Sequence, residues 1–130
     1  MPWVEVFAVL LVSHLSGDYL LQTEWQALNK RGGLGPDRES RRALLAHITT
    51  YTLAFVPAFV WLADDIGWAV IAAAAAVSIP HMVQDDGRLL AVFVRHVKGY
   101  EAASNPSVTA MVDQTFHVLA LFALALVVGT

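Results

Sequence analysis

Two long stretches without a formal charge constrain the fold of this chain more than any other feature. Residues 43–63 and 66–84 run for 21 and 19 residues with no Asp, Glu, Lys or Arg. A helix needs about 20 predominantly apolar residues to cross a bilayer, so each stretch predicts a membrane span. Apolar segments at Trp3–Trp25 and 106–128 predict two more. We therefore expect an all-α, integral-membrane four-helix bundle, a single transmembrane domain over residues 1–130.

The composition agrees with this expectation. Hydrophobic residues make up 57% of the chain and charged residues 15%, whereas soluble domains average about 45–50% and about 25%. The net charge of −3 gives no case for a nucleic-acid partner. The absence of cysteine excludes disulfides, thiolate metal sites and a cysteine nucleophile. Because the first residues lack the basic start of a signal peptide, we expect the first segment to be retained.

The first segment is the weakest of the four predicted spans. Its longest uncharged run, Val6–Gly17, covers 12 residues, and an amphipathic helix in water fits this segment nearly as well. The connection at 26–42 is polar and basic, with glycines that end helices. Asp37 or Ser40 is expected to cap the helix that follows.

The later connections also carry start and stop signals. Pro57 is expected to kink the second span. Residues 89–97 predict either a short helix lying in the membrane interface or a continuation of the third helix. Asn105 and Pro106 predict the cap and first residue of the last helix. Polar flanks predict solvated surface positions for three further residues, Glu24, Asp86 and His96.

Polar side chains recur at helical spacing within the apolar segments. His14, Asp18 and Gln22 are four residues apart, so they share an arc of about 80° on one helix face. The pairs His81/Asp85 and Asp113/His117 have the same spacing, and His47 and Tyr51 share a face early in the second span.

The alternating direction of four spans brings these polar groups together. They fall late in the first and third spans and early in the second and fourth, which places them at one side of the membrane. All eight Lys and Arg residues lie in the two connections of that side. By the positive-inside rule that side is cytoplasmic, so both termini are expected outside and the site near the cytoplasmic face.

Burying these carboxylates requires compensation. An Asp at the centre of a membrane helix costs about 2.5–3.5 kcal/mol on insertion scales, and a divalent cation would offset this cost. Imidazole and carboxylate ligands suit Zn, Mn or Fe, as one or two ions. A hydrogen-bonded network without metal is the alternative. The candidate metal ligands are His14, Asp18, His47, His81, Asp85, Asp113 and His117, and the other polar residues of the site are Gln22, Tyr51 and Gln114.

The leading hypothesis for such a site is a metal-dependent hydrolase. The metal would activate water, and a spare carboxylate, Asp18 or Asp113, would act as the catalytic base. The basic connections would attract an anionic headgroup or another phosphorylated substrate. Two alternatives stay open: an ion or proton relay, for which a homo-oligomer would have to complete the pathway, and a structural or partner-binding membrane protein.

The combination of motifs resembles a known family. His14-x-x-x-Asp18-x-x-x-Gln22, Asn29-Lys30, His47, His81-x-x-x-Asp85 and Asp113-Gln114-x-x-His117 are similar to the bacterial and phage membrane family of unknown function DUF3307, over essentially the whole chain. The resemblance implies a small multi-pass protein of the bacterial inner membrane without an assigned activity. A more distant similarity to membrane-bound metal-dependent hydrolases suggests hydrolysis. Arg88 departs from the family pattern, in which a lysine is usual.

Overall fold

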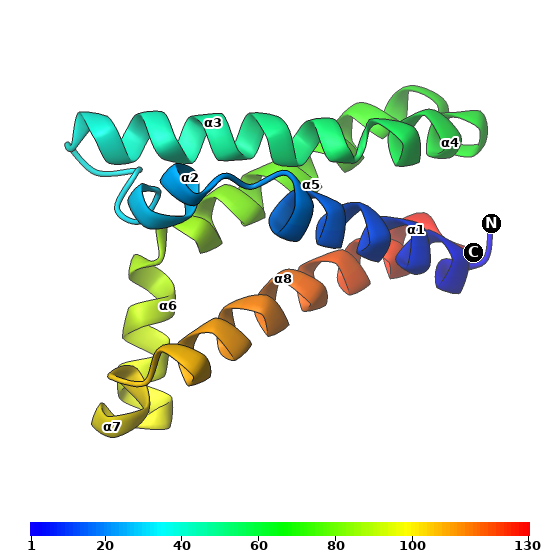
Figure 1. The fold of residues 1–130 in the computed structure, drawn as a ribbon. Helices are drawn as coiled ribbons and strands as arrows, with labels where there is room; N and C mark the ends of the chain where they lie inside the picture. The colour runs from blue at the N-terminus through cyan, green and yellow to red at the C-terminus, as the bar shows by residue number, and fades with distance from the viewer.

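The computed structural model describes residues 1–130 and is all-helical, as expected (Figure 1). Its elements in chain order are α1 (Trp3–Leu15), η1 (Ser16–Leu20), α2 (Glu24–Asn29), α3 (Arg38–Ala54), α4 (Val56–Ile66), η2 (Gly67–Ala69), α5 (Val70–Asp86), α6 (Arg88–Phe93), η3 (Val94–Lys98), α7 (Tyr100–Ala103) and α8 (Pro106–Val128).

The longer helices, α1, α3, α5 and α8, pack against one another. α8 contacts both α1 and α5, and α3 contacts α5 and the π-helical turn η1. Figure 1 shows the two termini together at one end of the molecule, while α6 and α7 project at the other end. The terminal amine donates to the Thr130 hydroxyl at 3.0 Å, so the two ends of the chain are joined.

Three helical stretches are long and apolar enough to cross a membrane: Trp3–Leu20, Val56–Asp86 and Pro106–Val128. The middle stretch contains both α4 and α5, which Gly67 separates. Gly67 has φ +56°, a conformation that glycine adopts without the steric cost of a Cβ. The chain turns there, and α4 and α5 contact each other.

The uncharged run at 43–63 is divided between two helices. α3 ends at Ala54, and Phe55 links it to α4, whose second residue is Pro57. Proline has no amide hydrogen for the helical ladder and its ring crowds the preceding turn. The kink expected at Pro57 is therefore present as a break at Phe55.

The first helix is shorter than the sequence predicts. Helical structure from Trp3 ends at Leu20, not at Trp25, which belongs to the separate helix α2. The reason is a competing start signal at Thr23. Its hydroxyl accepts from the Gln26 amide, and the Gln26 side chain accepts from the Thr23 amide, which forms a capping box.

The predicted helix starts agree better with the structure. Asp37 rather than Ser40 caps α3, since the Ser40 amide donates to the Asp37 carboxylate at 2.8 Å. Asn105 caps α8 and Pro106 is its first residue. Both caps place a side-chain acceptor on amides that no earlier carbonyl can reach.

The segment at 89–97 is a helix separate from α5. Gly87, with φ +79°, ends α5 and α6 begins at Arg88, so continuation of the third helix is wrong. Asp86 is also not solvated, as its exposed fraction is 4%. It accepts from the Leu34 amide at 2.9 Å and from Arg88 at 2.7 Å, and thereby ties the first connection to the end of α5.

The core has an apolar half and a polar half. The apolar cluster lies toward the termini and comprises Val6, Leu10, Tyr51, Phe55, Ala58, Leu62, Val77, Leu121 and Ala125. The buried histidines and acids lie beyond it, toward α6. Tyr51 belongs to both halves, because its ring packs in the apolar cluster and its hydroxyl reaches His14.

Candidate metal centre

Four buried side chains from three elements converge on one point. Asp18 comes from η1, His47 from α3, and His81 and Asp85 from successive turns of α5. One potential ligand atom from each lies within 4.8 Å of the other three. The i, i+4 spacing of the α5 pair places both side chains on the same helix face.

Five of the six separations among these atoms are 2.8–3.3 Å, somewhat shorter than the edges of a zinc-binding tetrahedron. The His47 Nε2 atom lies 2.8 Å from Asp85 Oδ2 and 3.1 Å from Asp18 Oδ1. The His81 Nε2 atom lies 3.0 and 3.3 Å from the same two oxygens, and 3.1 Å from His47 Nε2. Tetrahedral ligands with bonds of about 2.0–2.1 Å to zinc lie about 3.3–3.4 Å apart. A small expansion would therefore accommodate a cation.

A second convergence lies next to the first. The His117 Nδ1 atom is 2.7 Å from the Asp113 carbonyl oxygen, and a carbonyl only accepts, so Nδ1 carries the hydrogen. In the neutral ring Nε2 is then an acceptor. It faces the Asp85 carboxylate, with Oδ1 at 3.2 Å, and makes no hydrogen bond. A cation, either a proton or a metal ion, is needed between these two acceptors.

The buried charge also requires a cation. The side chains of Asp18 and Asp85 are 4% and 1% exposed. The only ammonium group that reaches them is Lys30, whose Nζ lies 2.8 Å from Asp85 Oδ2. One positive charge does not neutralise two carboxylates, and a buried uncompensated charge is strongly unfavourable. Protonated imidazoles or a metal ion must supply the remainder.

His14 orients the cluster rather than joining it. Its Nδ1 lies 2.9 Å from the Tyr51 hydroxyl, and its Nε2 lies 2.9 Å from Gln114 Oε1. The Gln114 amide in turn donates to Asp18 Oδ2 at 3.3 Å. Because the other oxygen of Asp18 has no hydrogen-bond partner, it is left free to face the histidines. This is the outer support that metal ligands commonly have.

Gly17 sets the distance between η1 and α3. A Cβ added there would lie 2.6 Å from Tyr51 Cδ2 and 3.3 Å from Tyr51 Cα. The Tyr51 ring also stacks on His81, with centroids 3.4 Å apart. The absence of a side chain at Gly17 therefore lets Asp18 approach the histidines of the other helices.

Sequence reasoning missed the part played by Lys30. Its ammonium donates to Gln22 Oε1 at 2.6 Å as well as to Asp85. The sequence places Lys30 only in a basic connection and in the Asn29-Lys30 motif of the family resemblance, and its position depends on α2, which was not predicted. The pairing of Gln22 with a cation inside the site was likewise not deduced.

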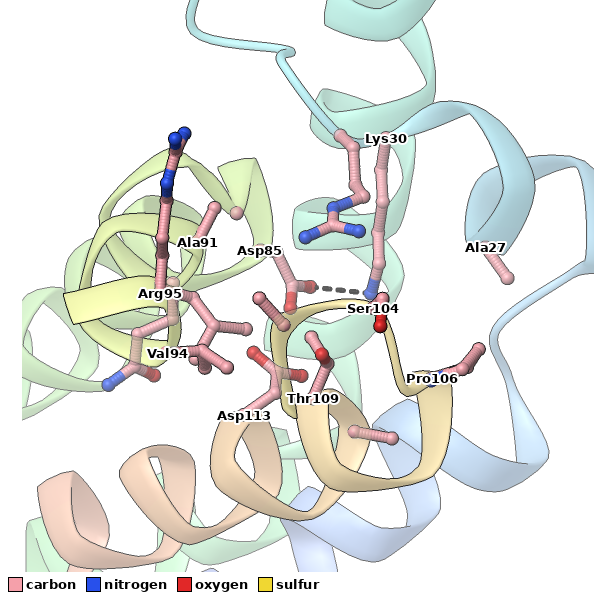
Figure 2. A pocket seen from close by; sticks show the side chains of 16 residues that line it. Ala27, Lys30, Asp85, Ala91, Val94, Arg95, Ser104, Pro106, Thr109 and Asp113 are labelled. Carbon is pink, nitrogen blue, oxygen red and sulfur yellow. Dashed lines mark hydrogen bonds and ion pairs between the residues drawn. The ribbon is translucent and has the colours of Figure 1, made fainter. Parts of the chain in front are cut away.

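A cavity with five charged residues in its lining leads from the surface to this cluster (Figure 2). Its volume is about 490 Å³, and its lining includes Lys30, Arg31, Asp85, Arg95 and Asp113. Figure 2 shows the Lys30–Asp85 pair on one side and Asp113 facing it from α8. Small-molecule sites commonly have volumes of about 300–1,000 Å³, so the cavity can admit a ligand.

The structure thus brings together six of the seven predicted metal ligands. They form two groups that share Asp85: Asp18, His47, His81 and Asp85, and Asp85, Asp113 and His117. The seventh, His14, and the polar residues Tyr51 and Gln114 lie directly beside them. The metal and catalytic roles themselves stay predictions.

A family model described as "Protein of unknown function (DUF3307)" matches residues 6–130. The chain belongs to the DUF3307 family. No curated protein and no solved structure matches it. Membership of DUF3307 covers every residue of the cluster but assigns no activity, so a function must be inferred from the site itself.

Proposed function

We propose that the chain is a four-span membrane protein whose buried His/Asp cluster binds a divalent metal ion for hydrolysis. The observation that supports the metal most strongly is the convergence of two imidazole nitrogens and two carboxylate oxygens, with nitrogen–oxygen and nitrogen–nitrogen separations of 2.8–3.3 Å. Nitrogen and carboxylate donors without sulfur favour Zn, Mn or Fe.

The metal's contribution would be to lower the pKa of a bound water toward about 7. Asp113 is the carboxylate of the cluster that also lines the cavity and is partly exposed, so we assign it as the general base. It would take a proton from the attacking water. The water oxygen then bonds to the electrophilic centre, the bond to the leaving group breaks, and the proton passes to the leaving group.

A relay across the membrane is less well supported than hydrolysis. The half of the core toward the termini is filled by apolar side chains, including Val6, Leu62 and Leu121. It offers no chain of polar groups from the cluster to the other end. A cavity that reaches the cluster from one end only suits a substrate that enters and leaves by the same route.

The orientation that we propose places the cluster in the cytoplasmic half of a bacterial inner membrane, with both termini outside. The basic residues of 26–42 and 88–98 support this arrangement by the positive-inside rule. Single cysteines can test it without interference, because the chain has none of its own. A cysteine at Thr130 should react with an impermeant maleimide in intact cells, and one at Arg38 should not.

An activity assay tests the proposed hydrolysis. Purified protein is loaded with zinc or manganese and given chromogenic phosphate and carboxylate esters. We expect turnover that EDTA abolishes. Asp113→Asn should lose turnover yet keep the metal of the first group, whereas His81→Ala should lose both. His96→Gln, at an exposed position outside the cluster, is the matched control. Turnover unaffected by EDTA or by Asp113→Asn would refute the mechanism.

A further inference from the structure

A second, apolar cavity lies next to the cavity that reaches the cluster. The apolar cavity, of about 460 Å³, lies between α5, α6 and α8, and is walled by apolar side chains that include Ile79, Leu89, Phe93 and Phe116. The Phe93 and Phe116 rings meet edge to face, with centroids 5.0 Å apart. Nothing in the chain fills this space.

The two cavities adjoin each other at the candidate reaction site. Gln84, Leu90 and Asp113 line both of them. A molecule that occupies both cavities would therefore lie against Asp113, the proposed base, where its polar part joins its apolar part. The first cavity, which contains the charged residues, is called the polar chamber below, and the second, whose lining is almost entirely apolar, the apolar chamber. Together they match the two parts of an amphiphile, a charged headgroup and an apolar chain.

The polar chamber is suited to an anion. Three basic residues line it, Lys30, Arg31 and Arg95, against two acidic ones, Asp85 and Asp113, so the basic residues are in excess. Lys30 is paired with Asp85, and the guanidinium of Arg95 lies over the Tyr100 ring at 4.6 Å. Arg31 makes no ion pair or side-chain hydrogen bond, so its charge is available to a ligand. Arginine matches phosphate oxygens with paired donors.

The apolar chamber is suited to an alkyl chain. Leu89 lies at its edge and is 68% exposed, and large exposed apolar side chains beside a cavity mark contact with lipid or an apolar ligand. The helix α6, which carries Leu89, leaves α5 at Gly87 (Figure 1), and the chamber lies between these two helices and α8.

We propose that the ligand of this site is a lipid-like amphiphile with an anionic, phosphate-bearing headgroup. The headgroup occupies the polar chamber near Arg31, the alkyl chain occupies the chamber between α5, α6 and α8, and the bond that joins them lies beside Asp113. This inference rests on the proposed hydrolase, for which it names the class of substrate.

Native mass spectrometry of the full-length protein tests the inference by counting bound molecules. The protein, released from a neutral polyoxyethylene detergent, is titrated with dodecyl phosphate, inorganic phosphate or dodecyl maltoside. EDTA is present so that no hydrolysis occurs. We expect one dodecyl phosphate per chain, and at least tenfold weaker binding of the other two probes because each fits only one chamber.

Two pairs of variants locate the binding. Leu89→Trp, which would fill the apolar chamber, and Arg31→Gln should each weaken dodecyl phosphate binding at least fivefold. The controls are Val92→Trp, on the same helix but outside the apolar chamber, and Arg38→Gln, in the same basic connection but outside the polar chamber. Equal effects of test and control variants would overturn the inference. So would dodecyl maltoside or inorganic phosphate binding as tightly as dodecyl phosphate.

Metal analysis of the same preparations, without EDTA, separates the two proposals. A protein that holds metal but does not discriminate among the three probes overturns the amphiphile inference alone. A protein that binds dodecyl phosphate in the expected pattern but never holds metal supports the two-chamber site and overturns the hydrolase. Both results are readable without an activity assay.

Discussion

Replacing Gly17 with alanine gives a sharp test of how the cluster is assembled. A glycine inside a helix usually costs about 0.5–1 kcal/mol relative to alanine, so helix propensity alone predicts that Gly17→Ala stabilises the protein. The structure predicts the opposite sign. The new Cβ would lie 2.6 Å from Tyr51 Cδ2, whereas carbon atoms pack at about 3.5–4.0 Å.

The size of the destabilisation follows from the groups that the new Cβ would displace. An approach about 1 Å too close forces η1 away from α3 or Tyr51 off its rotamer, and overpacking of this kind costs about 1–3 kcal/mol. The hydrogen bond between Tyr51 and His14, at 2.9 Å, contributes about 1 kcal/mol more. The higher helix propensity of alanine offsets part of this cost, so we expect Gly17→Ala to lower the free energy of unfolding by about 1–3 kcal/mol. Metal affinity should fall as well, because Asp18 follows Gly17 directly.

Equilibrium unfolding in mixed micelles measures this change, and a double-mutant cycle assigns its cause. In a Tyr51→Ala background most of the opposing atoms are gone, so Gly17→Ala should become neutral or stabilising. Leu20→Ala, at an exposed position of the same turn, is the control and should change stability by no more than about 0.5 kcal/mol. A stabilising Gly17→Ala in the wild-type background would refute the proposed close packing.

Two further predictions concern the charged residues Lys30 and Asp37. Lys30→Met should tighten zinc binding about tenfold or more, because the ammonium lies 2.8 Å from the proposed ligand oxygen Asp85 Oδ2 and repels a second cation. The same variant should destabilise the metal-free protein by about 3–5 kcal/mol, since Asp85 loses its buried partner. Zinc competition titrations measure the first effect, and equilibrium unfolding in EDTA measures the second. Weaker zinc binding by Lys30→Met would contradict the assignment of Asp85 as a ligand. The Ser40 amide holds the pKa of Asp37 below its ordinary value of 3.8. The cap therefore stabilises α3 above about pH 3.8 and is lost as the pH falls through the lower folded-state pKa. NMR titration of the Asp37 carboxyl should show this pKa, and Asp37→Asn should remove that pH dependence; a pKa at or above 3.8 would contradict the capping bond.

The convergence of the acids and histidines could be predicted because helical period and chain direction determine it. His81 and Asp85 share a face wherever their helix lies, and so do Asp113 and His117. Alternation of the longer segments then brings these faces to the same level. Neither the shared helix faces nor the alternating chain direction depends on the conformation of a loop, so the convergence of these acids and histidines can be predicted from residue spacing and helix order.

The remaining features depend on local competition that periodicity does not reveal. The capping box at Thr23 divides an apolar stretch that hydropathy treats as continuous. The position of Lys30 depends on this break, because the separate helix α2 begins there and ends next to Lys30. Asp86 resembled a surface acid by its neighbours, yet it is buried because the connection at 31–35 folds over it.

The metal content of the purified protein tests the central claim most directly. Elemental analysis would compare wild type with Asp18→Ala and His81→Ala, with His96→Ala as the control outside the cluster. We predict one equivalent or more of Zn, Mn or Fe in wild type and the control, and loss of that metal from both cluster variants while they stay folded. Absence of bound metal from folded wild type after supplementation with all three metals would contradict the account.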